Sequence, residues 1–456
     1  MITQNNRQGK RRNKMEKSCV SVVTYEKPIE SVARAVEMCK GRSAFKKGLK
    51  VFIKPNIVFW TRQVAFPKWG VITTSRVIED MVILLKDCGI DDITIGEGVV
   101  TRNPGDRETP THAFQTLGYD LLKKRYGIKY VNVMERGFCE IDLGDDIILN
   151  FNQDALDSDL IVDLPVLKAH NQTMVSLGIK NLKGLIDINS RKKCHSPDPT
   201  KDLHYHVARL ADKLPKVFTL IDGIYSLERG PGFDGKMHRK NLLIASTDIF
   251  AADKVGAKIL GFDPSQIPHL VHAAKNHDRP LDFSDVEIAG LALDDISRKH
   301  EYDFPYQEDA DGALPVPLAK QGIKGIYYRK YDTSMCTYCS GVNGVVLTAI
   351  RSAWTGDDFD KIEVLTGKMM TPTKGMNKTI LLGKCMFMAH RKNPDIKEMI
   401  PVKGCPPDPD DIVNAFHKAG IPVDAELFKH IDQLPGFFMA RYKDRPEYDE
   451  SFFRVE

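Results

Sequence analysis

The sequence predicts an α/β protein with a doubly wound, mostly parallel sheet and a smaller C-terminal module. Two observations carry this prediction. Short apolar runs alternate with segments of helical apolar spacing from residue 18 to residue 276, which is typical of βαβ units. Four cysteines then gather within the last third of the chain. Because 456 residues exceed one ordinary core, we expect two or three domains.

The elements follow from the spacing of apolar residues and from the residues that end each run. Pro55 ends one strand, Ser75 caps a helix, and Asp263-Pro264 ends another helix. The predicted strands cover 18–26, 49–54, 92–98, 129–134 and 160–168, with shorter apolar runs at 217–223 and 242–246. The predicted helices cover 29–39, 75–85, 111–126, 172–186, 202–214 and 248–260. Together they predict a three-layer, Rossmann-like domain.

Changes in composition suggest the domain boundaries. The acids, prolines and glycines after residue 276 indicate a connecting segment, and the basic N-terminus lacks a following apolar region. We therefore expect a basic disordered tail (1–17), an α/β ligand-binding domain (18–276), a connecting segment (277–327), a four-cysteine module (328–421) and a C-terminal helix and tail (422–456).

Composition excludes several classes of function. A net charge of +4 with 42% hydrophobic and 28% charged residues describes an ordinary globular protein and gives no reason to expect nucleic acid as a partner. No window approaches eighteen uninterrupted apolar residues, so we expect no membrane span. Nine cysteines without a secretion signal favour a reducing cytoplasm.

The C-terminal cysteines have the spacing of an inorganic centre. Cys336 and Cys339 form a CxxC pair, Cys385 follows Gly383-Lys384, and Cys405 follows a glycine. Thiolates select zinc, Cu(I) or iron–sulfur clusters. Zinc sites with four cysteines usually consist of two CxxC pairs, and here the second pair is split, so a [4Fe–4S] cluster is favoured, with structural zinc or unligated thiols as alternatives.

A second set of polar residues follows the predicted strands. Ligands of open α/β sheets lie beyond the carboxyl ends of the strands. The residues at those positions are Lys54, Asn56, Glu97, Lys168, His170 and Asp222. We expect Lys168 and His170 to act in catalysis and the other four to bind substrate.

The segment 178–184 adds further cations. Lys180 and Lys183 lie three residues apart, on one face of the predicted helix, and Asn181 lies between them. With His195 they suit an anionic ligand such as a carboxylate or phosphate, and Lys180 suits general acid–base chemistry. The alternatives are a solvated helix face for the lysines and a nucleophile–base or metal pair for Cys194-His195.

Common nucleotide and hydrolase motifs give no positive signal. The chain has no GxxxxGK[ST] and no GxSxG, and its GxGxxG match, Gly230-Pro-Gly232-Phe-Asp-Gly235, is a glycine-rich loop between two apolar runs that opens no predicted helix. Dinucleotide binding, P-loop ATP hydrolysis and α/β-hydrolase chemistry have no support, whereas a flavin stays open because flavin sites lack one short motif.

Two resemblances to known families add to these expectations. The CxxC opening a helix, the Gly-x-Cys and the Gly-Cys-Pro-Pro segment resemble the proximal-cluster module of nickel–iron hydrogenase small subunits. That resemblance implies one [4Fe–4S] cluster on Cys336, Cys339, Cys385 and Cys405. The blocks Val51-Phe-Ile-Lys54-Pro-Asn56, Leu164-Pro-x-Leu-Lys168-Ala-His170 and Gly178-Ile-Lys180-Asn181-Leu-Lys183-Gly184 are similar to the domain of unknown function 362 family over about residues 50–275. That resemblance implies a fold and a cluster, but no substrate.

Three functions fit these features. The first is an iron–sulfur redox protein of anaerobic metabolism that transfers electrons to or from an anionic small molecule or a redox partner protein. The second is a non-redox isomerase, lyase or ligase acting on a carboxylate, with a structural cluster or zinc. The third is an accessory or maturation factor for another metalloenzyme.

Overall fold

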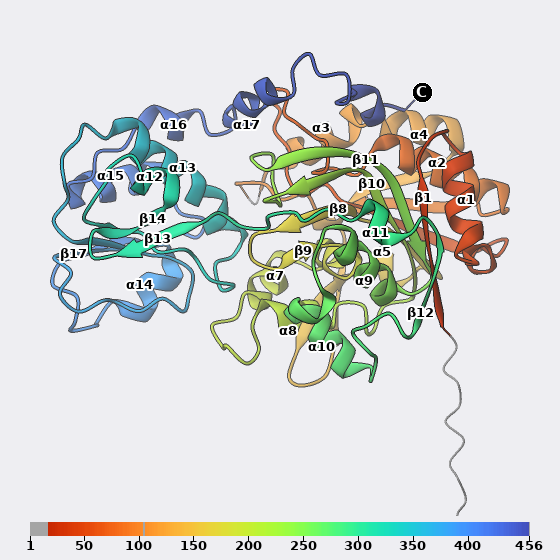
Figure 1. Ribbon diagram of the computed structural model, residues 1–456, viewed down its shortest axis with the longest axis horizontal. Coiled ribbons are helices and arrows are strands. Elements are labelled where there is room, and N and C mark those ends of the chain that lie inside the picture. The colour runs from red at the N-terminus through yellow and green to blue at the C-terminus, as the bar shows by residue number, and fades with distance from the viewer. Residues whose placement is uncertain (1–16, 104, 456) are drawn as a thin grey trace, which may run out of the picture.

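A computed structural model describes residues 17–103 and 105–455. The described chain forms two lobes, each built around its own sheet (Figure 1). The expected basic tail, apart from residue 17, lies outside the described residues.

The larger lobe contains a mixed, mostly parallel sheet of ten strands. Its main path is β12 (Val286–Gly290), β1 (Ser18–Thr24), β11 (Lys236–Ser246), β10 (Lys216–Glu228), β7 (Leu160–Leu164), β2 (Lys50–Pro55), β3 (Asp92–Glu97) and β4 (Lys129–Asn132). The pairs from β10 through β7, β2 and β3 to β4 are all parallel. Beside this path, β8 (Val166–His170) pairs parallel with β10 and antiparallel with β9 (Met174–Ser176). The predicted fold class is confirmed.

Helices cover both faces of this sheet. One core contains apolar residues of α1 (Glu30–Met38), α2 (Ser75–Asp87), α3 (Glu108–Thr116) and α4 (Tyr119–Tyr126). The other contains those of α6 (Gly178–Asn181), α7 (Ile188–Cys194), α8 (Leu203–Val207), α9 (Ile249–Ile259) and α10 (Pro268–Asn276). Smaller elements are α5 (Gln153–Leu156), α11 (Leu293–Ile296) and the hairpin of β5 (Phe138–Asp142) and β6 (Ile148–Asn152).

The smaller lobe has a sheet of six strands in sequence order. They are β13 (Tyr306–Asp309), β14 (Gly312–Pro315), β15 (Ile326–Tyr327), β16 (Ile362–Leu365), β17 (Lys378–Leu382) and β18 (Met399–Val402). Only β13 and β14 pair antiparallel. The helices of this lobe are α12 (Val316–Ala319), α13 (Thr337–Ala353), α14 (Lys384–His390), α15 (Pro409–Ala419) and α16 (Ala425–Lys429). The segment predicted as a connection, 277–327, thus supplies β12 to one sheet and β13–β15 to the other.

The chain end crosses back to the larger lobe (Figure 1). After α17 (Leu434–Phe437), the side chains of Tyr442, Phe453 and Val455 are buried in the core beneath α1–α4. Tyr442 and Tyr448 pack against Trp69, with ring centroids 5.6 and 5.3 Å away. The C-terminal segment therefore joins the two lobes.

Several predicted elements differ from those observed. The predicted helix 172–186 is instead β9, the short α6 and a 3-10 turn, because the Asp253 carboxylate accepts hydrogen bonds from Gly178 N and Ile179 N and starts a helix there. The helix predicted at 202–214 begins after the Asp202 cap but ends at Val207. The apolar runs at 217–223 and 242–246 are the buried halves of the long antiparallel strands β10 and β11.

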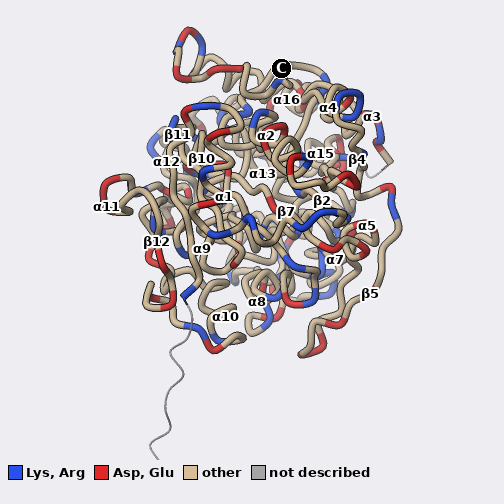
Figure 2. Tube along the Cα trace, turned by 90° about the vertical axis from the view of Figure 1, so that its right-hand side faces the viewer, with Lys and Arg blue, Asp and Glu red and all other residues tan. Residues whose placement is uncertain are grey.

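Charged residues of both signs are interspersed along the chain trace (Figure 2). Within the described ranges, no helix is both long enough and apolar enough to span a bilayer.

Candidate functional site

A cavity of about 1210 Å³ lies between the lobes. The larger lobe contributes the residues that follow β2, β3 and β8, together with the α6 segment. The smaller lobe contributes α13, the Pro406–Pro407 turn and the segment 427–438. Eight of the ten non-cysteine residues expected at a site line this cavity: Asn56, Glu97, Lys168, His170, Lys180, Asn181, Lys183 and His195.

A buried ion pair lies beneath the cavity floor. Lys54 Nζ, which has no exposed surface, lies 2.8 Å from Glu97 Oε2 and donates to Pro55 O at 2.6 Å. Glu97 also accepts hydrogen bonds from the backbone N–H groups of Ile57 and Gly98. Lys54 is therefore a support for Glu97 rather than a cavity-lining residue, and the charges of both are satisfied within the protein.

Asn181 joins this pair to the buried carboxyl group of Asp163. Its amide donates to Asp163 Oδ1 at 2.8 Å and to Lys54 O at 3.3 Å. Asp163 and Asp253 are fully buried, and burial raises the pKa of both carboxyls, that of Asp253 to about 7. Sequence reasoning missed Asp163, although it lies at the end of β7 beside the strand-end lysines.

Three lysines lie at the cavity floor. Lys168 is 1% exposed, and its Nζ donates to Val71 O at 3.3 Å. Burial lowers the pKa of Lys168 to about 7 and that of Lys183 to about 8. Burial and the charges of Lys183 and Lys168 also lower the pKa of Lys180. An anion placed among these ammonium groups would relieve their mutual repulsion.

The two expected histidines hold defined tautomers. His195 Nδ1–H donates to Thr333 O at 2.8 Å, since a carbonyl can only accept, so Nε2 accepts from Lys183 Nζ at 2.7 Å. His170 Nδ1 accepts from Gln172 N at 3.1 Å, which leaves the proton of the neutral ring on Nε2. Burial and neighbouring lysines lower the pKa of both rings well below the usual value, so both are neutral near pH 7.

Asp222, which we expected to bind substrate, does not line the cavity. Its carboxylate accepts hydrogen bonds from Thr74 N at 2.7 Å and from Ile224 N at 3.1 Å. Thr74 is the N-cap of α2, so Asp222 satisfies backbone groups at that helix start. Asn56 lines the cavity, but its amide nitrogen is held by Val71 O.

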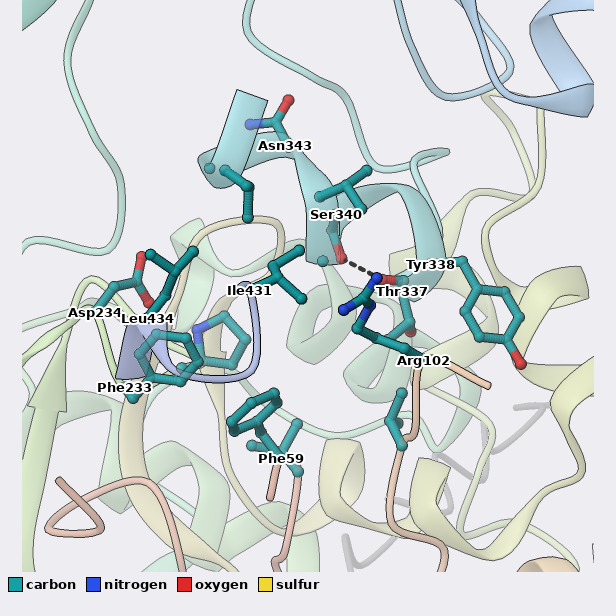
Figure 3. Close-up of a pocket in the computed structure, with 18 of the residues that line it drawn as sticks. Phe59, Arg102, Phe233, Asp234, Thr337, Tyr338, Ser340, Asn343, Ile431 and Leu434 are labelled. Carbon is teal, nitrogen blue, oxygen red and sulfur yellow. Dashed lines mark hydrogen bonds between the residues drawn. The ribbon is translucent and has the colours of Figure 1, made fainter. Parts of the chain in front are cut away.

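Arginines were not among the expected site residues. Arg191 lines the cavity and donates to Gly98 O at 2.9 Å and Gly184 O at 2.8 Å, which ties α7 to the turn after β3. Arg102 projects toward the start of α13 (Figure 3). Its ion pair with Asp432, at 3.7 Å, joins the larger lobe to the C-terminal segment. No motif marks either residue, because Arg191 is placed by the packing of α7 against the turn after β3, and Arg102 by the contact with the C-terminal segment.

The four expected cysteines lie close to one another in the smaller lobe. Cys336 is the N-cap of α13, Cys339 lies in its first turn, and Cys385 lies in the first turn of α14. Lys384 N donates to Gly404 O at 3.1 Å, which places the Cys385 and Cys405 segments together. The pKa of the Cys339 thiol is raised first by its hydrogen bond to Cys336 and by burial. The nearby thiols of Cys336, Cys385 and Cys405 raise it further.

Glycine makes this arrangement possible. Gly383 has a φ of +93°, and a Cβ there would lie 3.2 Å from Cys339 Sγ. All nine cysteines are free thiols; Cys385 and Cys405 are exposed, and Cys336 and Cys339 are partly buried. Within the described ranges, no three His, Cys, Asp or Glu residues are grouped so that they could hold a single metal ion.

Contacts link the cysteines to the cavity. Tyr338, which lies between Cys336 and Cys339 in the sequence, lines the cavity. Lys192 Nζ lies 5.0 Å from the centroid of the Tyr338 ring. Lys368 donates to Lys192 O at 2.8 Å and also to His195 O. The hydrogen bond to Cys339 lowers the pKa of Cys336, and the charge of Lys368 adds to this effect. The thiols and the cationic floor are thus separated by the first turn of α13 and the α7 end.

Comparison with known proteins agrees with the resemblance of the larger lobe. The thylakoid-associated protein sll1697 of Synechocystis sp. is 27% identical over 246 residues, which are 53% of this chain and 73% of that protein. Among solved structures, the lactate racemase apoprotein of Thermoanaerobacterium thermosaccharolyticum is 15% identical with a TM-score of 0.37, over 54% of this chain and 57% of that one. A Thermotoga maritima protein is 13% identical with a TM-score of 0.32, over 75% and 70%. Residues 51–258 match the model of the domain of unknown function DUF362, and the residues of the cavity floor lie within that matched range.

Proposed function

We propose that the protein is an iron–sulfur redox protein that exchanges single electrons with an anionic molecule bound in the cavity. One observation carries the proposal. At the start of α13, Cys336 and Cys339 are two of the four neighbouring cysteines, while Thr337, Tyr338 and Ser340 line the cavity. One helical turn would therefore contact both a cluster and a bound ligand.

The donor set supports a cluster better than zinc. A zinc ion holds four thiolates at about 2.3 Å each, so their sulfurs must crowd around one point. In a four-iron cluster each cysteine binds a different iron, and the thiolates stand further apart. The described thiols are close enough to influence one another but are not grouped around a single ion. Cys336, Cys339, Cys385 and Cys405 would hold the cluster, which would supply one-electron chemistry.

The residues of the larger lobe would bind and orient the ligand. Lys168, Lys180 and Lys183 would bind its anionic group, and the neutral His170 and His195 would hold or move protons near it. Lys54, Asn181 and Glu97 form the support below these groups. Burial beneath the second lobe would exclude water and strengthen each of these contacts.

Metal analysis of anaerobically purified protein tests this proposal. We expect about four irons per chain and a broad absorbance at roughly 400 nm. Electron paramagnetic resonance before and after dithionite should show a signal that changes with reduction. Stoichiometric zinc without iron would overturn the proposal.

A second candidate is a non-redox isomerase, lyase or ligase acting on a carboxylate. It is favoured by the lowered pKa of Lys168, about 7, because an amine that loses its proton near neutral pH suits general base catalysis. Here Lys168→Met would abolish turnover, whereas reducing the cluster would leave the rate unchanged.

A third candidate is an accessory factor for another metalloenzyme. The exposure of Cys385 and Cys405 favours it, because a partner could approach these two thiols directly. Capture of one stable partner, lost in the Cys385→Ser protein, would support it. Turnover of a small molecule by the protein alone would exclude it.

A further inference from the structure

The cavity lining has two chemically different parts. One, the lysine end, is formed by the strand ends of the larger lobe and contains the three lysines. The other, the apolar end, is formed by aromatic and aliphatic side chains from four segments of the chain. They include Phe59, Trp60, Phe233, Val342, Val345, Ile431, Leu434 and Phe438. Figure 3 shows Phe59, Phe233, Ile431 and Leu434 facing one another across the space.

The apolar end is a packed wall rather than a loose surface. The ring centroid of Phe233 lies 4.9 Å from that of Phe59 and 5.6 Å from that of Phe438. Thr61 donates to Asp432 O at 2.7 Å, which holds the segment carrying Ile431 and Leu434 against the larger lobe. The apolar side chains therefore keep a fixed position beside the polar floor.

The carboxylates that line the cavity do not cancel the charge of the lysine floor. Glu97 is paired with Lys54, Asp303 with Lys330, and Asp432 with Arg102. Asp106 accepts hydrogen bonds from Thr109. The side chain of Asp408 is exposed, and Asp234 lies beside Phe233 and Leu434 (Figure 3). Across the described residues, neither a hydrogen bond nor an ion pair is found for the side chain of Lys180.

The volume argues against a very small ligand. Sites for small molecules usually enclose about 300–1,000 Å³. This cavity, at about 1210 Å³, is above that range. An acid of two or three carbons would occupy the lysine end and leave the aromatic wall without a partner, although apolar surface favours apolar contact.

We propose that the cavity binds an amphipathic anion. Its carboxylate or phosphate group lies among Lys168, Lys180 and Lys183, and its extended apolar body lies against Phe59, Phe233 and Ile431. The inference builds on the proposed function, because it specifies the class of anionic molecule that the redox site would use. It requires no cluster for binding and so can be tested separately.

A chain-length series tests the inference on the full protein. Acetate, hexanoate, decanoate and decanol are titrated into the anaerobically purified protein in a calorimeter, with inorganic phosphate as a head-group probe. Each buried methylene should tighten binding roughly fourfold. We expect decanoate to bind at least about a hundredfold more tightly than acetate and at least about tenfold more tightly than decanol. A higher affinity for inorganic phosphate than for acetate would assign a phosphate head group.

Two variants locate the two ends. Phe233→Ala should lower the affinity for decanoate but leave the affinity for acetate within twofold of that of the original protein. Lys180→Gln should weaken both acids by a similar factor. Leu121→Ala, in an exposed position on α4, is the matched control and should change neither. Because the chain-length series uses the unaltered protein, it decides the question even if a variant fails to fold.

The possible outcomes separate this inference from the proposed function. Equal affinity for acetate and decanoate, or for decanoate and decanol, would overturn the amphipathic ligand even in protein that contains four irons. Chain-length-dependent binding by protein that contains zinc and no iron would support the ligand class and overturn the redox proposal.

Discussion

Raising the pH from 6 to 9 should remove most of the cavity's affinity for a carboxylate. Lys168 has a pKa of about 7 and Lys183 of about 8, because burial disfavours the ammonium form. A bound carboxylate favours the ammonium form. Binding should therefore take up a proton at each lysine that is neutral in the free protein. The affinity for the carboxylate falls as these lysines deprotonate, because each must then be protonated before it can attract the anion.

The magnitude follows from the two pKa values. At pH 6 both lysines are mostly charged. At pH 9 about one Lys168 in a hundred and about one Lys183 in ten remain charged. If the anion requires both charges, the affinity falls about a thousandfold over this range. The contribution of these two lysines to the slope of log Kd against pH rises from near zero at pH 6 to almost two at pH 9, and Lys180, whose pKa is also lowered, adds to it.

Calorimetry with decanoate measures both quantities. Titrations at pH 6, 7, 8 and 9, each in two buffers of different ionisation enthalpy, give the dissociation constant and the number of protons taken up. Decanoate itself stays ionised throughout. At pH 9 the Lys168→Met protein should take up one proton fewer than the original protein when decanoate binds. The control Lys216→Met, at the exposed start of β10, should leave the proton uptake unchanged.

A dissociation constant that changes less than about threefold between pH 6 and 9, with no proton uptake, would refute this reasoning. It would mean that the lysines keep their ordinary pKa values or that the anion binds elsewhere.

Three further predictions concern stability and metal content. Glu97→Gln leaves the buried Lys54 ammonium without a counter-charge, so urea titration should show a loss of about 3–5 kcal/mol, against about 1 kcal/mol or less for Asp91→Asn in the exposed pair with Lys86. Lys168→Met should raise the free energy of unfolding. The pKa of Lys168 in the folded protein, about 7, lies below its value in the unfolded chain. Burying its charged form therefore destabilises the folded protein fully below pH 7 and not at all above about pH 10.5. Thermal melts in which the Lys168→Met protein is no more stable than the original at pH 6 would contradict this prediction. Cys385→Ser should lower iron below about four per chain, whereas Cys139→Ser, on β5, should not; equal iron in both would exclude Cys385 as a ligand.

The strand-end residues could be predicted because a parallel sheet constrains them. The carboxyl ends of the neighbouring parallel strands β7, β2 and β3 meet at one edge, and β8 follows β7 in the chain, so Glu97, Lys168 and His170 line one cavity. The sheet of the larger lobe could be predicted for the same reason, since apolar runs alternated with helical segments. The identity of neighbouring strands could not, because pairing depends on contacts between residues far apart in the sequence.

Asp222 shows where this reasoning stops. It too ends an apolar run, but that run lies in the middle of β10, and the side chain meets the start of α2. Sequence position alone does not reveal how far a strand continues. The aromatic end of the cavity was equally hidden, because Phe59, Phe233 and Leu434 come from distant segments and meet only when the C-terminal segment crosses between the lobes.

The same helix that carries two of the cysteines provides a way to close the cavity without damaging the fold. Gly341 and Gly344 of α13 line the cavity, and a Cβ at either position would have no atom within 4 Å. Gly344→Leu should therefore place its side chain in the cavity, and replacing a helical glycine should stabilise α13 by about 1 kcal/mol. We expect a protein that melts higher than the original, keeps its iron and loses decanoate binding. Normal decanoate affinity in the Gly344→Leu protein would show that the ligand does not occupy the space beside α13.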